Sequence, residues 1–116
     1  MSLVSDRELL EFIGSPLYVS ADDIIRPQFD FAPILDSNEV VHSATVVTYL
    51  IPTDDDVSAT INNGSPGISG TKVTQGFYNF TVEVTYRVEV KVVIYTTAGA
   101  ATGKIFERYC TIHCTI

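Results

Sequence analysis

Apolar and polar residues alternate along most of this chain from Ser15 onward, and β-branched or aromatic side chains occupy many of the apolar positions. In residues 86–96, the even positions are apolar as far as Ile94, whereas the first three odd positions are charged. A period of two predicts β-strands that bury one face. Pro27 lacks an amide proton, so the first predicted strand should be an edge strand or an interrupted one. The expected strands span residues 24–31, 40–50, 57–61, 71–74, 78–85, 86–96 and 104–115.

Turn-forming residues separate these strands at short intervals. Pro52 and the aspartates after it end one strand, and Asn62-Asn63-Gly64 is a typical hairpin turn. Longer loops are expected at residues 62–71 and 97–103. This spacing predicts an all-β fold, namely an immunoglobulin-like antiparallel β-sandwich formed by residues 15–116. A chain of 116 residues is long enough for one such domain and too short for two ordinary ones.

The first fourteen residues have a different pattern, and we expect them to form an arm that contains a short helix. Ser5 and Glu8 match a capping box, and Gly14 is placed to end a helix that spans residues 6–13. Such a short helix needs a surface to pack on. It either covers an open end of its own domain or docks on a neighbouring subunit. Its candidate interface residues are Leu9, Leu10, Phe12 and Ile13.

The formal net charge of −7 argues against nucleic-acid binding, because contact with phosphates needs a basic face. Residues 1–56 contain eleven acidic and two basic side chains, whereas residues 57–116 contain three acidic and five basic ones. This asymmetry indicates either head-to-tail stacking in a homo-oligomer or ordinary solubilising charge. No apolar run approaches the ~20 residues of a membrane helix, and the first residues do not resemble a secretory signal. We therefore expect neither membrane insertion nor secretion.

The last strand contains Cys110, His113 and Cys114, a group that invites a metal or redox interpretation. Along a strand the two cysteines would lie on one face about 13 Å apart, with the histidine on the other face. That distance is too long for a disulfide or for one zinc ion. We expect two buried free cysteines, no metal and no cofactor.

Other candidate sites are equally weak. The run Asp54–Asp56 has the oxygens that calcium prefers, but it lacks the alternating ligand spacing of an EF-hand loop, so a solvated turn is the simpler interpretation. His42 and His113 both lie within predicted strands, and no serine has the glycine setting of a nucleophile elbow. We predict that the protein is not an enzyme; a small hydrolase is the least favoured alternative.

Three blocks of sequence carry a resemblance to a known family. The stretch DDIIRPQFDFAPIL has an acidic pair, two aliphatic residues, the core Phe29-Asp30-Phe31 and an aliphatic end at Leu35. A second block covers residues 40–46, and the third includes residues 96–99 and then Glu107-Arg108. Together they resemble a family of small proteins of tailed bacteriophages and prophages. The resemblance implies an immunoglobulin-like component of the tail or neck of the virion, of the fibre–tail adaptor kind.

The resemblance implies assembly with itself, with other phage structural proteins, or with both, in the cytoplasm of a bacterial host and then in the virion. Arg108 is the one charge on the apolar face of the last strand, so it needs a carboxylate or the edge of the sheet. Asp30 would be either that partner or a solvated edge charge. The alternative function is a carbohydrate-binding or adhesin-like module. Its sugar platform would use tyrosines such as Tyr49, Tyr78, Tyr95 or Tyr109.

Overall fold

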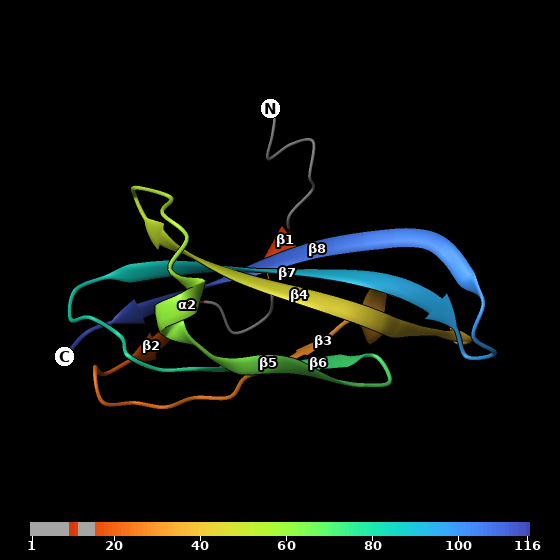
Figure 1. The fold of residues 1–116 in the computed structure, drawn as a ribbon, viewed down its shortest axis with the longest axis horizontal. Helices are drawn as coiled ribbons and strands as arrows, with labels where there is room; N and C mark the ends of the chain where they lie inside the picture. Colours follow the sequence, from red (N-terminus) through yellow and green to blue (C-terminus); the bar gives the residue numbers. More distant parts are fainter. Residues whose placement is uncertain (1–9, 12–15) are drawn as a thin grey trace.

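The computed structural model describes residues 10–11 and 16–116, which form an all-β fold of two sheets (Figure 1). The large sheet has the strand order β1-β8-β7-β4, and β2 also pairs with β8; the small sheet has the order β3-β6-β5. The strands of the large sheet are β1 Leu10–Glu11, β2 Leu17–Val19, β4 Glu39–Ile51, β7 Thr85–Thr96 and β8 Ala101–Cys114. Those of the small sheet are β3 Gln28–Asp30, β5 Asn62–Ser69 and β6 Lys72–Phe77. Two short helices complete the fold, the 3-10 helix η1 Ala32–Ile34 and the α-helix α2 Ser58–Ile61.

The three long strands of the large sheet confirm the strongest sequence patterns. β7 lies between β4 and β8 and pairs antiparallel with both. Its even-numbered residues from Val88 to Ile94 are fully buried. Residues 86–96 therefore form the central strand that their alternation predicts, since a strand with neighbours on both sides must bury its apolar face.

One hydrophobic core lies between the sheets and takes side chains from both. Phe29, Val73 and Phe77 contribute from the small sheet, opposite valines of β7. Phe31 follows β3 directly and is 1% exposed. The two phenylalanines of the Phe29-Asp30-Phe31 core are thus both buried, and Leu35 packs against the same cluster. Each such ring removes on the order of 150–250 Å² from water.

Residues 57–69 depart from the prediction. The expected strand 57–61 is instead helix α2, and the expected turn at residues 62–64 lies within strand β5. The cause is side-chain bonding to β4: the Ser58 hydroxyl accepts a hydrogen bond from the Thr48 amide (2.8 Å), and the Asn62 amide group donates to the Val46 carbonyl (3.0 Å). β5 forms despite its glycines because a bulge between Asn63 and Gly67 absorbs residues that cannot stay in register.

The strand expected at residues 78–85 is also wrong, because only Thr85 belongs to a strand. Asn79 and Glu83 adopt positive φ angles of 62° and 67°, which an extended strand does not allow. The loop is anchored by Phe80, which packs on Tyr86 at a ring-centroid distance of 5.8 Å. The strand expected at residues 71–74 is the first part of β6.

At the N-terminus, the described residues differ from the helix expected over residues 6–13. Leu10–Glu11 form β1, which pairs parallel with β8 opposite Arg108 and Tyr109. The helix prediction is wrong for these two residues. A helix this short is only marginally stable, whereas the edge of β8 offers unpaired N–H and C=O groups with which these residues can pair. The rest of the predicted helix lies outside the described residues, as do Leu9, Phe12 and Ile13 of the candidate interface.

Residues on both sides of the expected boundary between arm and domain pair with β8. β2 was not predicted; it runs parallel to β8, with Leu17 opposite Ile112 and Val19 opposite Cys114. Within the described ranges, no helix has the length and apolar character needed to cross a membrane.

Candidate assembly surface

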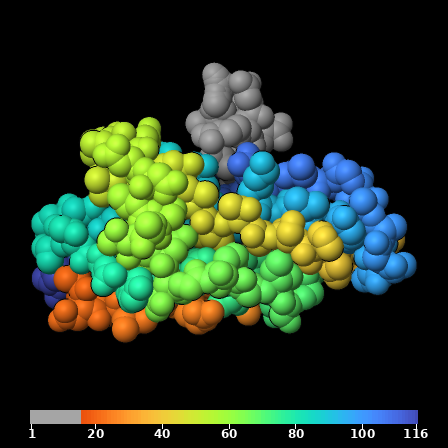
Figure 2. Space-filling model, viewed as in Figure 1, coloured from red at the N-terminus to blue at the C-terminus, as the bar shows by residue number. Residues whose placement is uncertain are grey.

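One end of the two-sheet domain collects four chain segments that are distant in sequence. A single row across the large sheet joins Ile51, Thr85, His113 and Tyr18, in the strand order β4, β7, β8 and β2. Four strands at the usual spacing make this row about 14 Å wide. The segments beyond the row are 20–25, 52–56, 78–84 and 115–116. In Figure 2 the parts near residue 20 (orange), near residue 80 (teal) and at the C-terminus (dark blue) meet at the left of the molecule.

Backbone hydrogen bonds hold three of these segments together, namely 20–25, 78–84 and 115–116. The Thr115 amide donates to the Val19 carbonyl (2.9 Å), and the Glu83 amide donates to the Cys114 carbonyl (2.8 Å). The Ala21 amide donates to the carbonyl of the last residue. Three of the four segments are therefore fixed to one another, and the turn at 52–56 is bonded to Leu50 at the end of β4, so little ordering is left for a binding step.

Exposed apolar side chains concentrate at this end. Four of the six large hydrophobic side chains that are exposed among the described residues lie here, although such residues are normally scattered singly over a surface. They are Tyr18 (69% exposed), Ile24 (71%), Val82 (45%) and Ile116 (76%). The sequence pattern did not point to them as a surface: Ile24 and Val82 fall in strands that were expected to be longer, and Tyr18 lies on the unpredicted strand β2.

Acidic side chains lie in the same segments at this end of the domain. Six exposed carboxylates lie in the same segments, at Asp22, Asp23, Asp54, Asp55, Asp56 and Glu83. One nearby cation, Arg87, pairs with Asp54 (3.1 Å) and with Glu89 (2.9 Å). With Glu89 counted beside Arg87, seven carboxylates and one guanidinium give a local charge of −6. We call segments 18–25, 52–56, 82–84 and 115–116 the acidic end.

The aspartate run is a hydrogen-bonded turn, as its solvated-turn interpretation predicts. Asp56 accepts a hydrogen bond from the Ser58 amide (2.9 Å), and this bond holds the pKa of Asp56 below its usual value. Asp55 accepts one from the Thr53 hydroxyl (3.0 Å). The described part of the chain has no group of three or more His, Cys, Asp or Glu side chains that could hold a metal ion.

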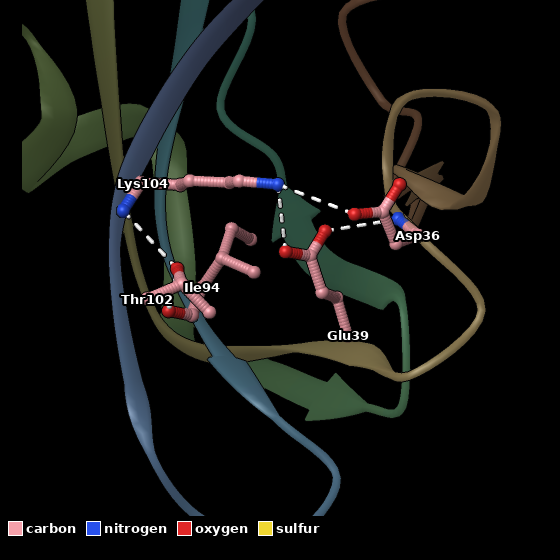
Figure 3. A network of polar contacts seen from close by, with 5 residues as sticks. All are labelled: Asp36, Glu39, Ile94, Thr102 and Lys104. Atoms are coloured by element: carbon pink, nitrogen blue, oxygen red, sulfur yellow. Dashed lines mark hydrogen bonds and ion pairs between the residues drawn. The ribbon is translucent and has the colours of Figure 1, made fainter.

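At the opposite end, charges from distant parts of the sequence pair within the chain (Figure 3). Lys104 Nζ lies 2.7 Å from Glu39 Oε2 and 3.5 Å from Asp36 Oδ2, and the Asp36 amide donates to Glu39 Oε1 (2.9 Å). The hydrogen bond from Lys104 is the main cause that lowers the pKa of Glu39, and the same bond raises the pKa of Lys104. The acidic first half and the basic second half of the sequence are thus interleaved in space.

The structure separates the residues of the family-like blocks. Asp30 is exposed on the edge strand β3, where it accepts hydrogen bonds from the Ala32 amide (2.9 Å) and the Thr71 hydroxyl (3.0 Å). This confirms the interpretation of Asp30 as an edge charge; the Ala32 bond, aided by Lys72, lowers its pKa. Arg108 is half-buried on β8, and its Nη1 donates to the Glu107 carbonyl (2.8 Å).

The C-terminal cysteines and histidine lie as strand geometry predicts. Cys110 and Cys114 are thiols outside any disulfide, and both are buried in the core. His113 is on the opposite face of β8, where its Nδ1 lies 2.7 Å from the Thr85 hydroxyl. The cysteines are therefore core residues.

The four tyrosines of the carbohydrate alternative are all half-buried. The Arg87 guanidinium lies over the Tyr49 ring, 5.0 Å from its centroid. Tyr95 is stacked on His42, with ring centroids 3.7 Å apart. Tyr78 and Tyr109 are half-buried, whereas Tyr18, at the acidic end, is the exposed tyrosine of the described chain.

These features were compared with known proteins. No model of a protein family matches the chain, and no curated protein matches it.

Proposed function

We propose that this protein is a non-enzymatic structural module of a phage or prophage particle that acts through protein–protein assembly. The observation that carries the proposal is the acidic end, because four of the six exposed large hydrophobic side chains of the described residues lie in segments at this one end of the domain. Exposed apolar residues that cluster in this way mark interaction sites. A surface built from four segments is suited to contact with another protein.

The order of the strands supports an immunoglobulin-like sandwich. In that fold the second, fifth and fourth strands form one sheet, and the third, sixth and seventh form the other. If β1 and β2 are taken together as the first strand, then β3, β6 and β5 are the second, fifth and fourth strands, and they form the small sheet. The third, sixth and seventh strands are then β4, β7 and β8, which lie together in the large sheet. The phage family that the sequence resembles has an immunoglobulin-like fold, so strand order and resemblance support the same proposal.

The direct test is to look for this chain in particles released by the cells that encode it. Particles are purified on a density gradient, and their proteins are quantified by mass spectrometry. We expect the chain to band with the particles in a constant ratio to the other structural proteins. A chain that remains in the soluble cell fraction, stays monomeric by light scattering at high concentration and binds a glycan array would contradict the proposal.

A further inference from the structure

Resting on the proposed assembly role, we infer that the acidic end docks on a basic surface of a different protein and not on a second copy of this chain. The partner's surface has an apolar centre surrounded by lysine and arginine side chains.

The acidic end has the composition of a docking surface. Protein interfaces have an apolar centre with aromatic anchors and a polar rim. Here Tyr18 and Ile116 are each more than two-thirds exposed, and carboxylates such as Asp22 and Glu83 lie in the same segments. With a local charge of −6, attraction selects a partner whose rim is basic.

The opposite end of the same chain does not provide that basic rim. It holds three carboxylates, Asp30, Asp36 and Glu39, and two ammonium groups, Lys72 and Lys104, for a local charge of −1. Lys104 is already bonded to both Glu39 and Asp36. Head-to-tail stacking would bring −6 against −1, and a two-fold contact between acidic ends would bring −6 against −6. Both arrangements are repulsive.

The other cations of the described residues do not form a basic patch. Arg26 lies against Gly76 of the small sheet, where its Nη1 is 2.8 Å from the position that a Cβ on Gly76 would take. Arg108 of β8 is paired with Val90 of β7, so it faces the same side of the large sheet as Val90. Lys91 is the next residue along β7 and therefore faces the opposite side. No described surface of a second copy is therefore complementary to the acidic end.

A zero-length carbodiimide cross-linker, which joins carboxylates to lysine amines, tests this inference on the purified particles. We expect cross-links from Asp22, Asp23, Glu83 or the aspartates at 54–56 to lysines of another structural protein. Intermolecular links to Lys72, Lys91 or Lys104 of a second copy, or no link from the acidic end to another protein, would overturn the inference. Absence of the chain from the particles would instead contradict the proposed function, so the two failures are distinguishable.

The protein identified by cross-linking is then purified, and its affinity for the full chain is measured by titration at several salt concentrations. Asp22→Lys should weaken binding on the order of tenfold at low salt, with a smaller loss at high salt because exposed charges are screened. The control carries Ser37→Lys with Ser69→Lys, two exposed positions away from the acidic end that add the same charge of +2. Equal loss of affinity in both variants would contradict a contact at the acidic end.

Discussion

We predict that replacing Gln75 by glutamate makes the stability of this protein fall steeply with rising pH. Gln75 lies on β6 with its side chain in the core, and it is 0% exposed. Its amide nitrogen donates to the carbonyl oxygens of Gly64 and Gly76, each at 2.9 Å. The first of these carbonyls belongs to the bulge of β5, so Gln75 supplies a partner that the interrupted ladder lacks. Its Oε1 has no hydrogen-bond partner within the described chain.

A glutamate at this position would place a carboxyl oxygen against the Gly64 and Gly76 carbonyl oxygens, which now accept hydrogen bonds from the Gln75 nitrogen. The ionised form would be buried and repelled, whereas the protonated form donates one hydrogen bond, so the pKa in the folded state rises. In the unfolded chain the pKa is about 4.3. The folded state then holds more protons than the unfolded state, and the free energy of unfolding falls by about 1.36 kcal/mol per pH unit above that value. Between pH 4.3 and pH 7 the loss is about 3.7 kcal/mol, provided that the folded pKa exceeds 7.

The assay is urea unfolding of the wild type and Gln75→Glu from pH 4 to pH 8, followed by circular dichroism. The matched control is Gln28→Glu, the same substitution at an exposed position of β3. The difference between Gln75→Glu and wild type should grow steadily with pH, while the control stays within about 0.5 kcal/mol of wild type. A Gln75→Glu profile parallel to the control would refute the reasoning, because it would mean that the carboxylate ionises at no cost in the folded protein.

Three further predictions concern other bonds of the fold. Ionised Glu39, with its lowered pKa, stabilises the protein above the ordinary value of 4.5, and this contribution is lost as the pH falls through the folded pKa. Glu39→Gln should therefore flatten the acid limb of a stability–pH curve, and Lys104→Gln should do the same; an unchanged limb would contradict the ion pair. Asn62→Ala should lower the free energy of unfolding by about 1–3 kcal/mol, because β4 loses both of its hydrogen bonds to the Asn62 side chain. A loss below about 0.5 kcal/mol, measured by urea titration, would show that these two bonds contribute little. Cys110 and Cys114 should react with an aromatic disulfide reagent in denaturant and hardly at all in the native protein, and rapid native reaction of either thiol would show that it is not buried.

The prediction of the long strands from sequence succeeded where burial on one face imposes a period of two. β4, β7 and β8 were all expected, and the alternation in β8 also placed Cys110 and Cys114 in the core. The same reasoning failed for residues 57–69, whose local residues are typical of a short strand followed by a turn. There the bonds from Asn62 and its neighbours to β4 decide the conformation, and those bonds join residues ten to sixteen positions apart.

By itself, the sequence determined that this is a β-protein with a strongly acidic balance and with cysteines placed to be core residues. These properties depend on residue type and on the local period of two. The tertiary structure alone decided that Tyr18 and Ile116 lie at the same end, because parallel pairing of β2 with β8 and one row of register across four strands bring them together. It also decided that Lys104 neutralises Glu39 and is not part of a separate basic face. Both outcomes depend on contacts between residues far apart in the chain, which no local pattern encodes.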